Sequence, residues 1–289
     1  MLSAMSRHKD WAVLVCLVGN GQEINRGEAG IGAWFSALLA GFPDWEIYLP
    51  PRIDANAFVD GGTVSRVLDR PRVYVEEGLH LATGARSFRA ESVSTFVNAL
   101  IAKEETLAQR AFAEIGGRFP IVVTRDAERA RAWLRTRMRG TQRAGVVATS
   151  KARRLRPYAM NVRAKIEPEE WFLNPREDIR SSSFLEEVAT EFDIQGLELD
   201  WVCVAWDADL RMESGEWRPY RFRGTSWQRV WEPAEAEYCK NAYRVLLTRA
   251  RLGMVLFVPE GDRADETRQP RFYDAVFQYL RGLGIPEMQ

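Results

Sequence analysis

Near its carboxyl end the chain reads Tyr243-Arg244-Val245-Leu246-Leu247-Thr248-Arg249-Ala250-Arg251 and continues into the apolar run Met254-Val255-Leu256-Phe257-Val258. The apolar run is typical of a strand buried on both faces, as in a parallel sheet covered by helices. The segment before it predicts a helix that ends beside the sheet at Arg249. A guanidinium there is planar and always charged, so it can meet a phosphate in two-point geometry. A surface arginine that closes a helix is the competing interpretation.

Short apolar segments alternate with helical patterns along the chain, which predicts an α/β fold with a mostly parallel sheet and flanking helices. The expected strands are residues 12–18, 45–49, 120–124, 145–149, 188–190, 201–206 and 254–258. The expected helices include residues 30–40 and 91–103, an arginine-rich helix that ends at Gly140, and residues 270–283. Residues 52–70 are rich in turn formers, and we place the boundary between two domains there, at residues 1–60 and 61–289.

Composition limits the class of protein. Forty basic residues balance forty acidic ones, so net charge indicates no particular partner. Cys16 and Cys203 lie in apolar runs, where inert buried thiols are found, and no Cys-x-x-Cys pair is present, which predicts a reduced, cytoplasmic protein. Two histidines, His8 and His80, leave little scope for a histidine metal site, and we predict no metal site. No apolar run approaches the roughly 18 residues of a membrane span.

A glycine-rich segment follows the first predicted strand. It reads Gly19-Asn20-Gly21-Gln22-Glu23-Ile24, directly after Val18. Ligands of open α/β folds lie at the carboxyl ends of strands, and glycines there allow a close approach of the backbone. The Gln22 amide can donate a hydrogen bond to a phosphate oxygen.

Two further segments are polar at the ends of predicted elements. Ser87-Phe88-Arg89 opens an amphipathic helix, and Thr190-Glu191-Phe192-Asp193-Ile194-Gln195-Gly196-Leu197-Glu198 joins two predicted strands. A solvated helix start and an ordinary loop are the competing interpretations of these two segments.

Taken in chain order, the segments that contain Gln22, Arg89, Gly196 and Arg249 resemble motifs III, IV, V and VI of UvrD/Rep-type superfamily 1 helicases. Residues 19–30, 241–251 and 257–262 are also similar to the Schlafen group three-like DNA/RNA helicase domain. The resemblance implies the end of a first RecA-like lobe followed by a whole second RecA-like lobe of the P-loop NTPase superfamily. It implies that residues near the terminal phosphate of ATP are catalytic, namely Gln22, Arg89 and Arg249. The residues that it implies for holding the nucleotide are Gly19, Gly21, Gly196 and Glu198.

The sequence departs from the UvrD/Rep pattern at a few positions. Asn20 stands where that pattern has an aspartate, and the spacing before Gln22 is shorter by one residue. Phe192 and Gln195 stand where it has a histidine and a lysine. Arg86 is the alternative to Arg89 in the second segment.

Basic residues are concentrated between Arg118 and Lys165, where only Asp126 and Glu128 are acidic. This excess predicts a phosphate-binding face, and a solvated helix face explains it equally well. The expected contacts with single-stranded nucleic acid follow a predicted strand, at Ser150, Lys151, Arg153 and Arg154, and the resemblance adds Thr190. A tryptophan-rich segment (Trp206, Trp217, Trp227 and Trp231) could stack bases, although packing within a hairpin is favoured.

The sequence contains no Gly-x-x-x-x-Gly-Lys-[Ser/Thr] and no Asp-Glu pair directly after an apolar strand. It therefore lacks a loop for the β-phosphate and the carboxylates that hold Mg²⁺. Phosphoryl transfer needs the metal, the P-loop lysine and the arginines together. We therefore expect the C-terminal part of a motor that shares ATP and Mg²⁺ with a separate P-loop-containing polypeptide and does not hydrolyse ATP alone. The alternatives are a non-catalytic helicase-like module that binds nucleic acid or a partner, and an unrelated nucleotide-binding α/β protein.

Overall fold

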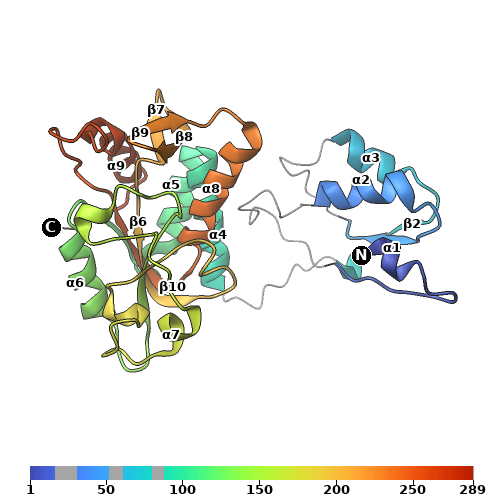
Figure 1. The fold of residues 1–289 in the computed structure, drawn as a ribbon, viewed down its shortest axis with the longest axis horizontal. Coiled ribbons are helices and arrows are strands. Elements are labelled where there is room, and N and C mark those ends of the chain that lie inside the picture. Colours follow the sequence, from blue (N-terminus) through green and yellow to red (C-terminus); the bar gives the residue numbers. More distant parts are fainter. Residues whose placement is uncertain (17–30, 52–60, 80–87, 289) are drawn as a thin grey trace. The chain divides into compact units, whose positions relative to one another are not determined.

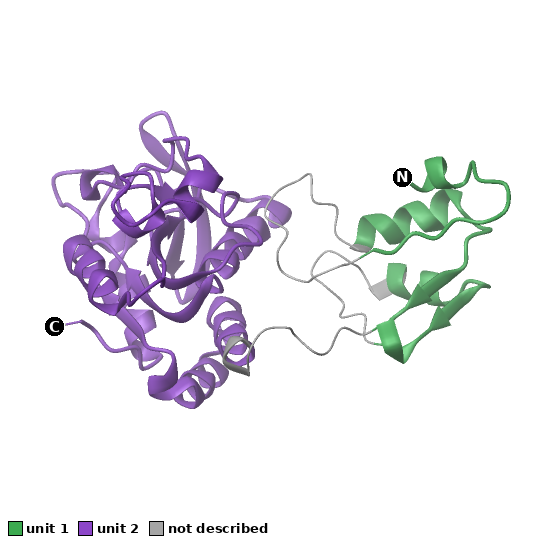
Figure 2. Cartoon of the chain, turned by 90° about the horizontal axis from the view of Figure 1, so that it is seen from below, with its two compact units in different colours: residues 1–85 green, residues 86–289 purple. Residues whose placement is uncertain are grey.

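The computed structural model describes residues 1–16, 31–51, 61–79 and 88–288. The chain divides into two compact units, residues 1–85 (unit 1) and 86–289 (unit 2), which Figure 2 colours separately. Each unit has its own hydrophobic core and is described by itself.

Unit 1 combines short helices with a pair of parallel strands. Its elements are α1 (Leu2–Met5), α2 (Ile31–Gly41), β1 (Ile47–Leu49), α3 (Gly61–Leu68), β2 (Val73–Val75) and the 3-10 helix η1 (Glu77–Leu79). A small core forms between α2, the two strands and α3, with Phe35, Ile47 and Val67 buried in it. The expected helix at residues 30–40 and the expected strand at 45–49 correspond to α2 and β1.

The apolar run at residues 12–18 is not a buried strand in the part that the structure describes. Residues 11–16 have no regular secondary structure, and Val13 and Val15 are 67% and 78% exposed. Cys16 is exposed, so the expectation of a buried thiol is wrong there, whereas Cys203 is buried. A strand covered on both faces needs hydrogen-bonding neighbours. The described residues of unit 1 contain two three-residue strands, and these pair with each other.

Unit 1 extends beyond the domain boundary expected at residue 60. Strand β2 pairs with β1, so α3 and β2 pack with the preceding residues, and the units separate after Ala85. The assignment of residues 1–60 to the end of a first RecA-like lobe stays a prediction.

Unit 2 is built on a parallel sheet of five strands in the order β3-β10-β6-β4-β5. The strands are β3 (Ile121–Thr124), β4 (Ala144–Ala148), β5 (Val188–Ala189), β6 (Leu199–Ala205) and β10 (Ala250–Phe257). Each one overlaps an apolar run that predicted it. The last of these five strands along the chain, β10, lies between β3 and β6.

Helices cover both faces of this sheet (Figure 1). The α-helices of unit 2 are α4 (Phe88–Ala102), α5 (Glu105–Ile115), α6 (Ala127–Arg137), α7 (Pro168–Leu173), α8 (Pro233–Leu247) and α9 (Asp274–Gly282). The 3-10 helices are η2 (Gly116–Arg118), η3 (Arg156–Tyr158), η4 (Ser182–Phe184) and η5 (Pro270–Phe272). Val202 and Val204 of β6 face the α4 and α8 side, while Cys203 and Ala205 face α6. This strict alternation places two apolar layers on one strand.

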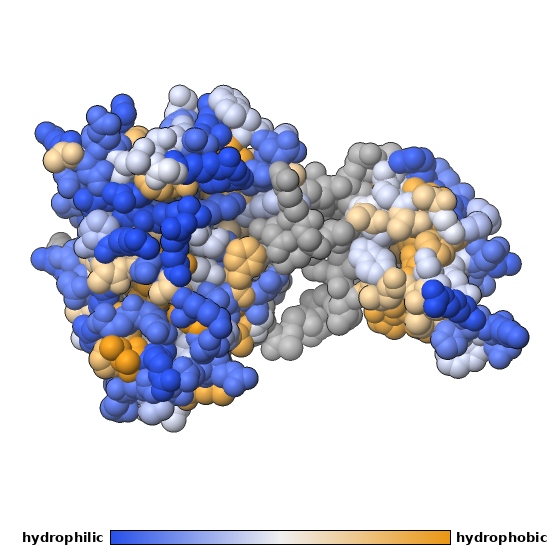
Figure 3. All heavy atoms as spheres, viewed as in Figure 1, coloured by the Kyte–Doolittle hydropathy of each residue, from blue (hydrophilic) through white to orange (hydrophobic). Residues whose placement is uncertain are grey.

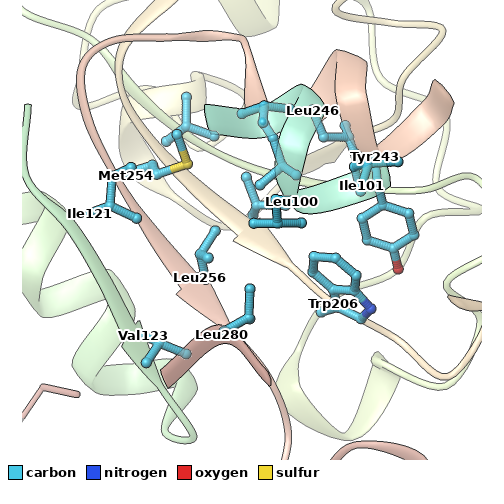
Figure 4. Packing of buried hydrophobic residues seen from close by; sticks show 14 of the residues in the cluster. Leu100, Ile101, Ile121, Val123, Trp206, Tyr243, Leu246, Met254, Leu256 and Leu280 are labelled. Carbon is cyan, nitrogen blue, oxygen red and sulfur yellow. The ribbon is translucent and has the colours of Figure 1, made fainter. Parts of the chain in front are cut away.

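A separate antiparallel meander follows β6. Its strands are β7 (Leu210–Glu213), β8 (Glu216–Arg223) and β9 (Ser226–Arg229). Trp217 stacks on Trp206 with ring centroids 5.3 Å apart, and Trp206 stacks on Tyr243 at 4.2 Å. Figure 4 shows Trp206 and Tyr243 close to α4 residues such as Leu100. The packing interpretation is therefore confirmed for Trp206 and Trp217, whereas Trp231 is 75% exposed.

The helices on both faces of a parallel sheet confirm the predicted α/β class and are consistent with a RecA-like fold. Among the helices that the structure describes, none is both long enough and apolar enough to cross a membrane.

Candidate functional site

The parallel sheet of unit 2 separates the predicted site residues into two groups. Its strands all run in one direction, so their amino ends form one edge, the amino edge, and their carboxyl ends form the carboxyl edge. Arg249 and Glu198 directly precede β10 and β6 and lie at the amino edge. Ser150 and Thr190 follow β4 and β5 and lie at the carboxyl edge.

Arg249 is buried at the amino edge, with 2% of its surface exposed. Its Nε donates a hydrogen bond to Val245 O at 3.0 Å, and its Nη1 donates to Leu197 O at 3.4 Å. Its Nη2 donates to Thr248 Oγ1 at 3.2 Å. All three guanidinium nitrogens thus bond to oxygens of the protein in this conformation. To bind a phosphate, Arg249 would have to exchange some of these bonds.

The end of the loop between β5 and β6 lies against Arg249. Besides accepting from the guanidinium, this segment returns a hydrogen bond, from Leu199 N to Arg249 O at 3.0 Å. Gly196 has a φ of +84°, a left-handed conformation that residues with a side chain rarely adopt. Glu198 is half-buried next to it. The structure therefore brings Gly196, Glu198 and Arg249 to one edge of the sheet, and their roles toward a nucleotide stay predictions.

The other residues expected to bind the nucleotide lie outside the described part of the chain, or their side chains do. Gly19, Gly21 and Gln22 lie outside the described residues. Arg89 belongs to the first turn of α4, and its side chain is also outside them. Helix α4 packs against α8, the helix that precedes Arg249. The roles of these four residues stay predictions.

Three buried carboxylates gather at the carboxyl edge. Asp207 and Asp209 follow β6 and have no exposed surface, and Glu191 follows β5 with 2% exposed. We call these three residues the carboxylate clamp. They hold the segment that follows β4, residues 149–154, through hydrogen bonds that this segment donates.

Each clamp carboxylate binds a different part of that segment. Thr149 Oγ1 donates to Asp209 Oδ2. Ser150 N and Oγ donate to Glu191 at 2.7 and 2.8 Å. Farther along, the backbone N–H of residue 154 donates to Asp207 Oδ2 at 2.8 Å. Because buried polar groups need partners, these bonds fix the course of the segment.

Two tyrosines complete the clamp, and burial perturbs its titration. Tyr243 OH donates to Asp209 Oδ1 at 2.7 Å, and Tyr273 OH donates to Asp207 Oδ1 at 3.1 Å. Burial raises the pKa of Asp207 to about 7, and the nearby Asp209 carboxylate adds to that rise. Burial also raises the pKa of Asp209 and of Glu191. Loss of solvation disfavours the charged form, and the hydrogen bonds offset part of that cost.

Carboxylates of the clamp and of Asp193 accept hydrogen bonds from groups that we expected to contact nucleic acid. Ser150 uses both its amide and its hydroxyl on Glu191. Thr190 donates its amide and hydroxyl to Asp193 Oδ2 at 2.7 and 2.6 Å. In this conformation carboxylates accept the hydrogen bonds of both hydroxyls, and the role of Ser150 and Thr190 in nucleic-acid binding stays a prediction.

The three basic residues of the same segment differ in their partners. Arg154 pairs with Asp265 at 2.8 Å. Arg153 donates to Phe222 O at 3.3 Å, and desolvation lowers its pKa. Lys151 is half-exposed, and its ammonium group has no hydrogen bond or ion pair with the residues that the structure describes. Among these three basic residues, Lys151 is therefore the one whose side chain makes no bond to the described part of the protein.

The basic run between residues 118 and 165 is not one continuous face. Several of its arginines bond to the protein itself: Arg125 to Asp274 and Pro259 O, Arg131 to Leu185 O, Tyr158 O and Glu128, and Arg143 to Leu173 O and Asn174 O. Others are exposed, among them Arg135, Arg137 and Arg139 at the end of α6. On the face drawn in Figure 3, hydrophilic side chains cover most of unit 2. The exposed members fit the interpretation of a solvated face, and phosphate binding by this run stays a prediction.

Sequence reasoning missed the carboxylate clamp. Its signal was present, because Asp207 and Asp209 follow the apolar strand at residues 201–206 almost directly. An adjacent Asp-Glu pair is the pattern expected for Mg²⁺ ligands, and Asp207 and Asp209 are separated by Ala208. Within the described part of the chain, no three Asp, Glu, His or Cys side chains are arranged to hold a metal ion. The clamp binds the protein's own donors instead.

The family model described as Schlafen group 3, DNA/RNA helicase domain, matches residues 1–260. The chain belongs to this family. No curated protein and no solved structure was found to match it. The Schlafen group 3 helicase-domain match includes both edges of the sheet and every predicted site residue, and it ends before α9. The prediction of a helicase-like domain, made from the four sequence segments, is thereby confirmed.

Proposed function

We propose that the chain is the C-terminal part of a nucleic-acid-dependent NTPase or helicase of superfamily 1, with unit 2 as its second RecA-like lobe. The family match to a DNA/RNA helicase domain supports the class. The observation that carries the proposal is the junction of Arg249 with the Gly196–Glu198 segment at the amino edge. These residues come from separate parts of the chain, yet they meet beside one strand pair.

In this proposal ATP and Mg²⁺ are the cofactors. Arg89 and Arg249 supply positive charge to the terminal phosphates, and Gln22 senses the terminal phosphate. Gly196 lets the backbone approach a phosphate, and Glu198 bonds the ribose. Charge that develops on a transferring phosphoryl group is stabilised by such preorganised cations. Arg249 first has to give up bonds to Leu197 O or Thr248 Oγ1, so nucleotide binding and the conformation of this loop are linked.

The missing P-loop defines the expected partner. A separate polypeptide with a Gly-x-x-x-x-Gly-Lys-[Ser/Thr] loop would supply the lysine and the Mg²⁺ ligands, and single-stranded nucleic acid would be the polymer. We therefore expect no ATP hydrolysis above background from the purified chain, even with Mg²⁺ and single-stranded DNA or RNA.

The test combines hydrolysis with nucleotide binding. A fluorescent ATP analogue should bind weakly to the chain, and Arg249→Gln should remove most of that binding. Arg251→Gln is the matched control, because Arg251 lies on β10, two residues after Arg249, with a 64% exposed side chain. Unfolding in urea is measured for both variants. Turnover that survives Arg249→Gln would overturn the proposal, because it would require a different active site.

A non-catalytic nucleic-acid-binding or interaction module is the second candidate. It is favoured by the burial of Arg249 among protein oxygens, which gives this residue a structural role without any nucleotide. The two candidates predict different results. If the chain is such a module, it binds nucleic acid but no ATP analogue. Arg249→Gln then lowers the stability of the fold and has no further effect.

A further inference from the structure

A pocket of about 390 Å³ opens on the α6 side of the amino edge. It is lined by Trp133, Thr136, Arg137, Arg139, Gln142 and Trp201. Four of these come from α6 and the turn after it, Gln142 from just before β4, and Trp201 from β6. Its volume falls within the range of about 300–1,000 Å³ that is usual for small-ligand sites.

The two tryptophan rings form a corner. Trp133 and Trp201 meet edge to face, with ring centroids 5.6 Å apart and planes at 84°. Trp201 is fixed from behind by Gly253 of β10, since a Cβ at residue 253 would come within 2.7 Å of its ring. The ring of Trp201 is 8% exposed, and Trp133 is half-exposed toward the pocket. The exposed part of the Trp133 ring is a surface on which a flat aromatic ligand can stack.

Gln142 is held with one polar group unused. Its Oε1 accepts from Trp201 Nε1 at 3.1 Å and from Arg139 N at 3.0 Å. These two bonds fix the orientation of the amide. Its Nε2 group therefore faces away from both donors and has no acceptor among the described residues. It is a hydrogen-bond donor in a fixed position at the pocket.

Two positive charges stand at the same pocket without a carboxylate. Arg137 lies over the rings of Trp133 and Trp201, 5.0 and 5.9 Å from their centroids. Arg139 is exposed beside it. Neither side chain makes an ion pair or hydrogen bond with any residue in the described part of the chain. Guanidinium groups so placed favour an anion, most of all one with oxygens for two-point contact.

We propose that this pocket binds one nucleotide unit. The base stacks on Trp133, its edge accepts a hydrogen bond from Gln142 Nε2, and its phosphate lies between Arg137 and Arg139. An acidic peptide would satisfy the arginines but would leave the aromatic corner and the fixed amide unused. The nucleotide is either free or part of a single strand, because both present the same base and phosphate. The site is separate from Arg249 and does not depend on the role proposed for that residue.

Binding is measured by calorimetry on the full chain with four probes: a nucleoside monophosphate, inorganic phosphate, a short single-stranded oligonucleotide and the same oligonucleotide with abasic positions. We expect the nucleotide and the oligonucleotide to bind more tightly than phosphate and the abasic strand. Trp133→Leu should weaken nucleotide binding by at least about fivefold, as loss of one stacked base does. Preference for the oligonucleotide over the monophosphate identifies a strand as the source, and the reverse preference identifies a free nucleotide.

Matched variants test the geometry. Gln142→Glu keeps both accepted hydrogen bonds while replacing the Nε2 donor with a negative charge, so it should abolish binding without unfolding the pocket. Arg137→Gln should weaken binding. Arg135→Gln, exposed on the same helix, and Trp231→Leu, an exposed tryptophan capped by Arg229 at 4.0 Å, should change it less than about twofold.

Three results would each overturn the inference. One is equal affinity for phosphate and nucleotide, which would leave only an anion site. Another is equal weakening by Arg135→Gln and Arg137→Gln, which would mean diffuse attraction to a basic helix. The third is unchanged binding in Gln142→Glu. Repeating the titration with Arg249→Gln separates this pocket from the proposed NTPase site, because the pocket should still bind when that site fails.

Discussion

The two edges of the parallel sheet in unit 2 differ in how their charged side chains are paired. At the carboxyl edge, buried carboxylates accept hydrogen bonds from the segment at residues 149–154. At the amino edge, Arg137 and Arg139 line an open pocket and make no ion pair with the residues that the structure describes. Open α/β folds usually bind ligands at the carboxyl ends of strands. Here the acidic side chains of the carboxylate clamp already bind the protein's own donors at that edge. Charged side chains without an ion pair therefore indicate a ligand site better than position in the sheet does.

Removing a clamp carboxylate should have the largest effect on stability. Asp209→Ala leaves the hydroxyls of Thr149 and Tyr243 without an acceptor, and each unsatisfied buried group costs about 1–3 kcal/mol. We expect the free energy of unfolding to fall by about 2–6 kcal/mol in urea titrations. Glu216→Ala, an exposed carboxylate of β8, should change it by less than about 0.5 kcal/mol.

A second substitution sharpens that result. Tyr243→Phe removes one of the two orphaned hydroxyls, so adding it to Asp209→Ala should recover about 1 kcal/mol of unfolding free energy. If the two losses simply add, the hydroxyl does not depend on Asp209 and the clamp is not a coupled network.

The pH dependence of stability should report Asp207. Its folded pKa is about 7, above the ordinary value of 3.8, so between these values the folded state holds a proton that the unfolded chain has released. The free energy of unfolding must then decrease as pH rises through this window, by about 3 kcal/mol from pH 5 to pH 8. Asp207→Asn should flatten this slope, whatever its effect on the absolute stability.

The other two clamp carboxylates are the competing source of such a slope, because burial raises the pKa of Asp209 and of Glu191 as well. The measurement is therefore repeated with Asp209→Asn and with Glu191→Gln. A slope that persists in Asp207→Asn and disappears in one of these two variants would contradict the assignment.

At the amino edge a smaller effect is expected from the loop glycine. Gly196→Ala places a side chain on a residue with φ +84°, which costs about 1–2 kcal/mol. The same change should weaken binding of an ATP analogue, because Leu197 O and Glu198 adjoin Arg249. The control is Gly282→Ala, at a position with no positive φ and open space around it, which should be nearly neutral in unfolding experiments.

The smallest effect on stability, but a specific one on binding, is expected from Lys151→Ala. Unfolding should change by less than about 0.5 kcal/mol. Affinity for single-stranded nucleic acid should fall, and the slope of log affinity against log salt should decrease in magnitude by about one. Lys165→Ala, an 84% exposed lysine paired with Glu167, is the control and should leave both unchanged. Equal effects of the two substitutions would mean that the whole basic run attracts nucleic acid without a defined contact.

The sheet of unit 2 was predictable because its strands are covered on both sides, which requires continuous apolar runs such as residues 254–258. The same rule failed at residues 12–16, since an apolar run becomes a buried strand only where neighbours exist to pair with it. The position of Arg249 beside β10 followed from the adjacency of helix and strand. Its burial did not, because the acceptor Leu197 O lies far away in the sequence and no local pattern encodes that contact.

At the candidate sites, too, local sequence patterns were predictable and contacts between residues far apart in the sequence were not. The resemblance assigned Gly196, Glu198 and Arg249 to a nucleotide site, and in the structure these three residues lie at one edge of the sheet, while their roles stay predictions. Sequence could not divide the basic run into bonded and free members, because Arg131 and Arg137 lie on one helix and differ only in what faces them. Nor could it pair Trp133 with Trp201, since that contact depends on how α6 crosses the sheet.

The placement of β3 has a consequence for how the protein is made. On one side β3 pairs with β10, and on the other Val123 exchanges hydrogen bonds with Pro286 O and Met288 N, at 3.0 and 2.9 Å. Both neighbours of this apolar strand are therefore synthesised after β4, β5 and β6. During translation β4 and β6 can pair first, while residues 121–124 keep two unpaired edges until the residues beyond 250 emerge. An apolar strand with unpaired edges can associate with other chains, so this segment is exposed to aggregation while the nascent chain is incomplete.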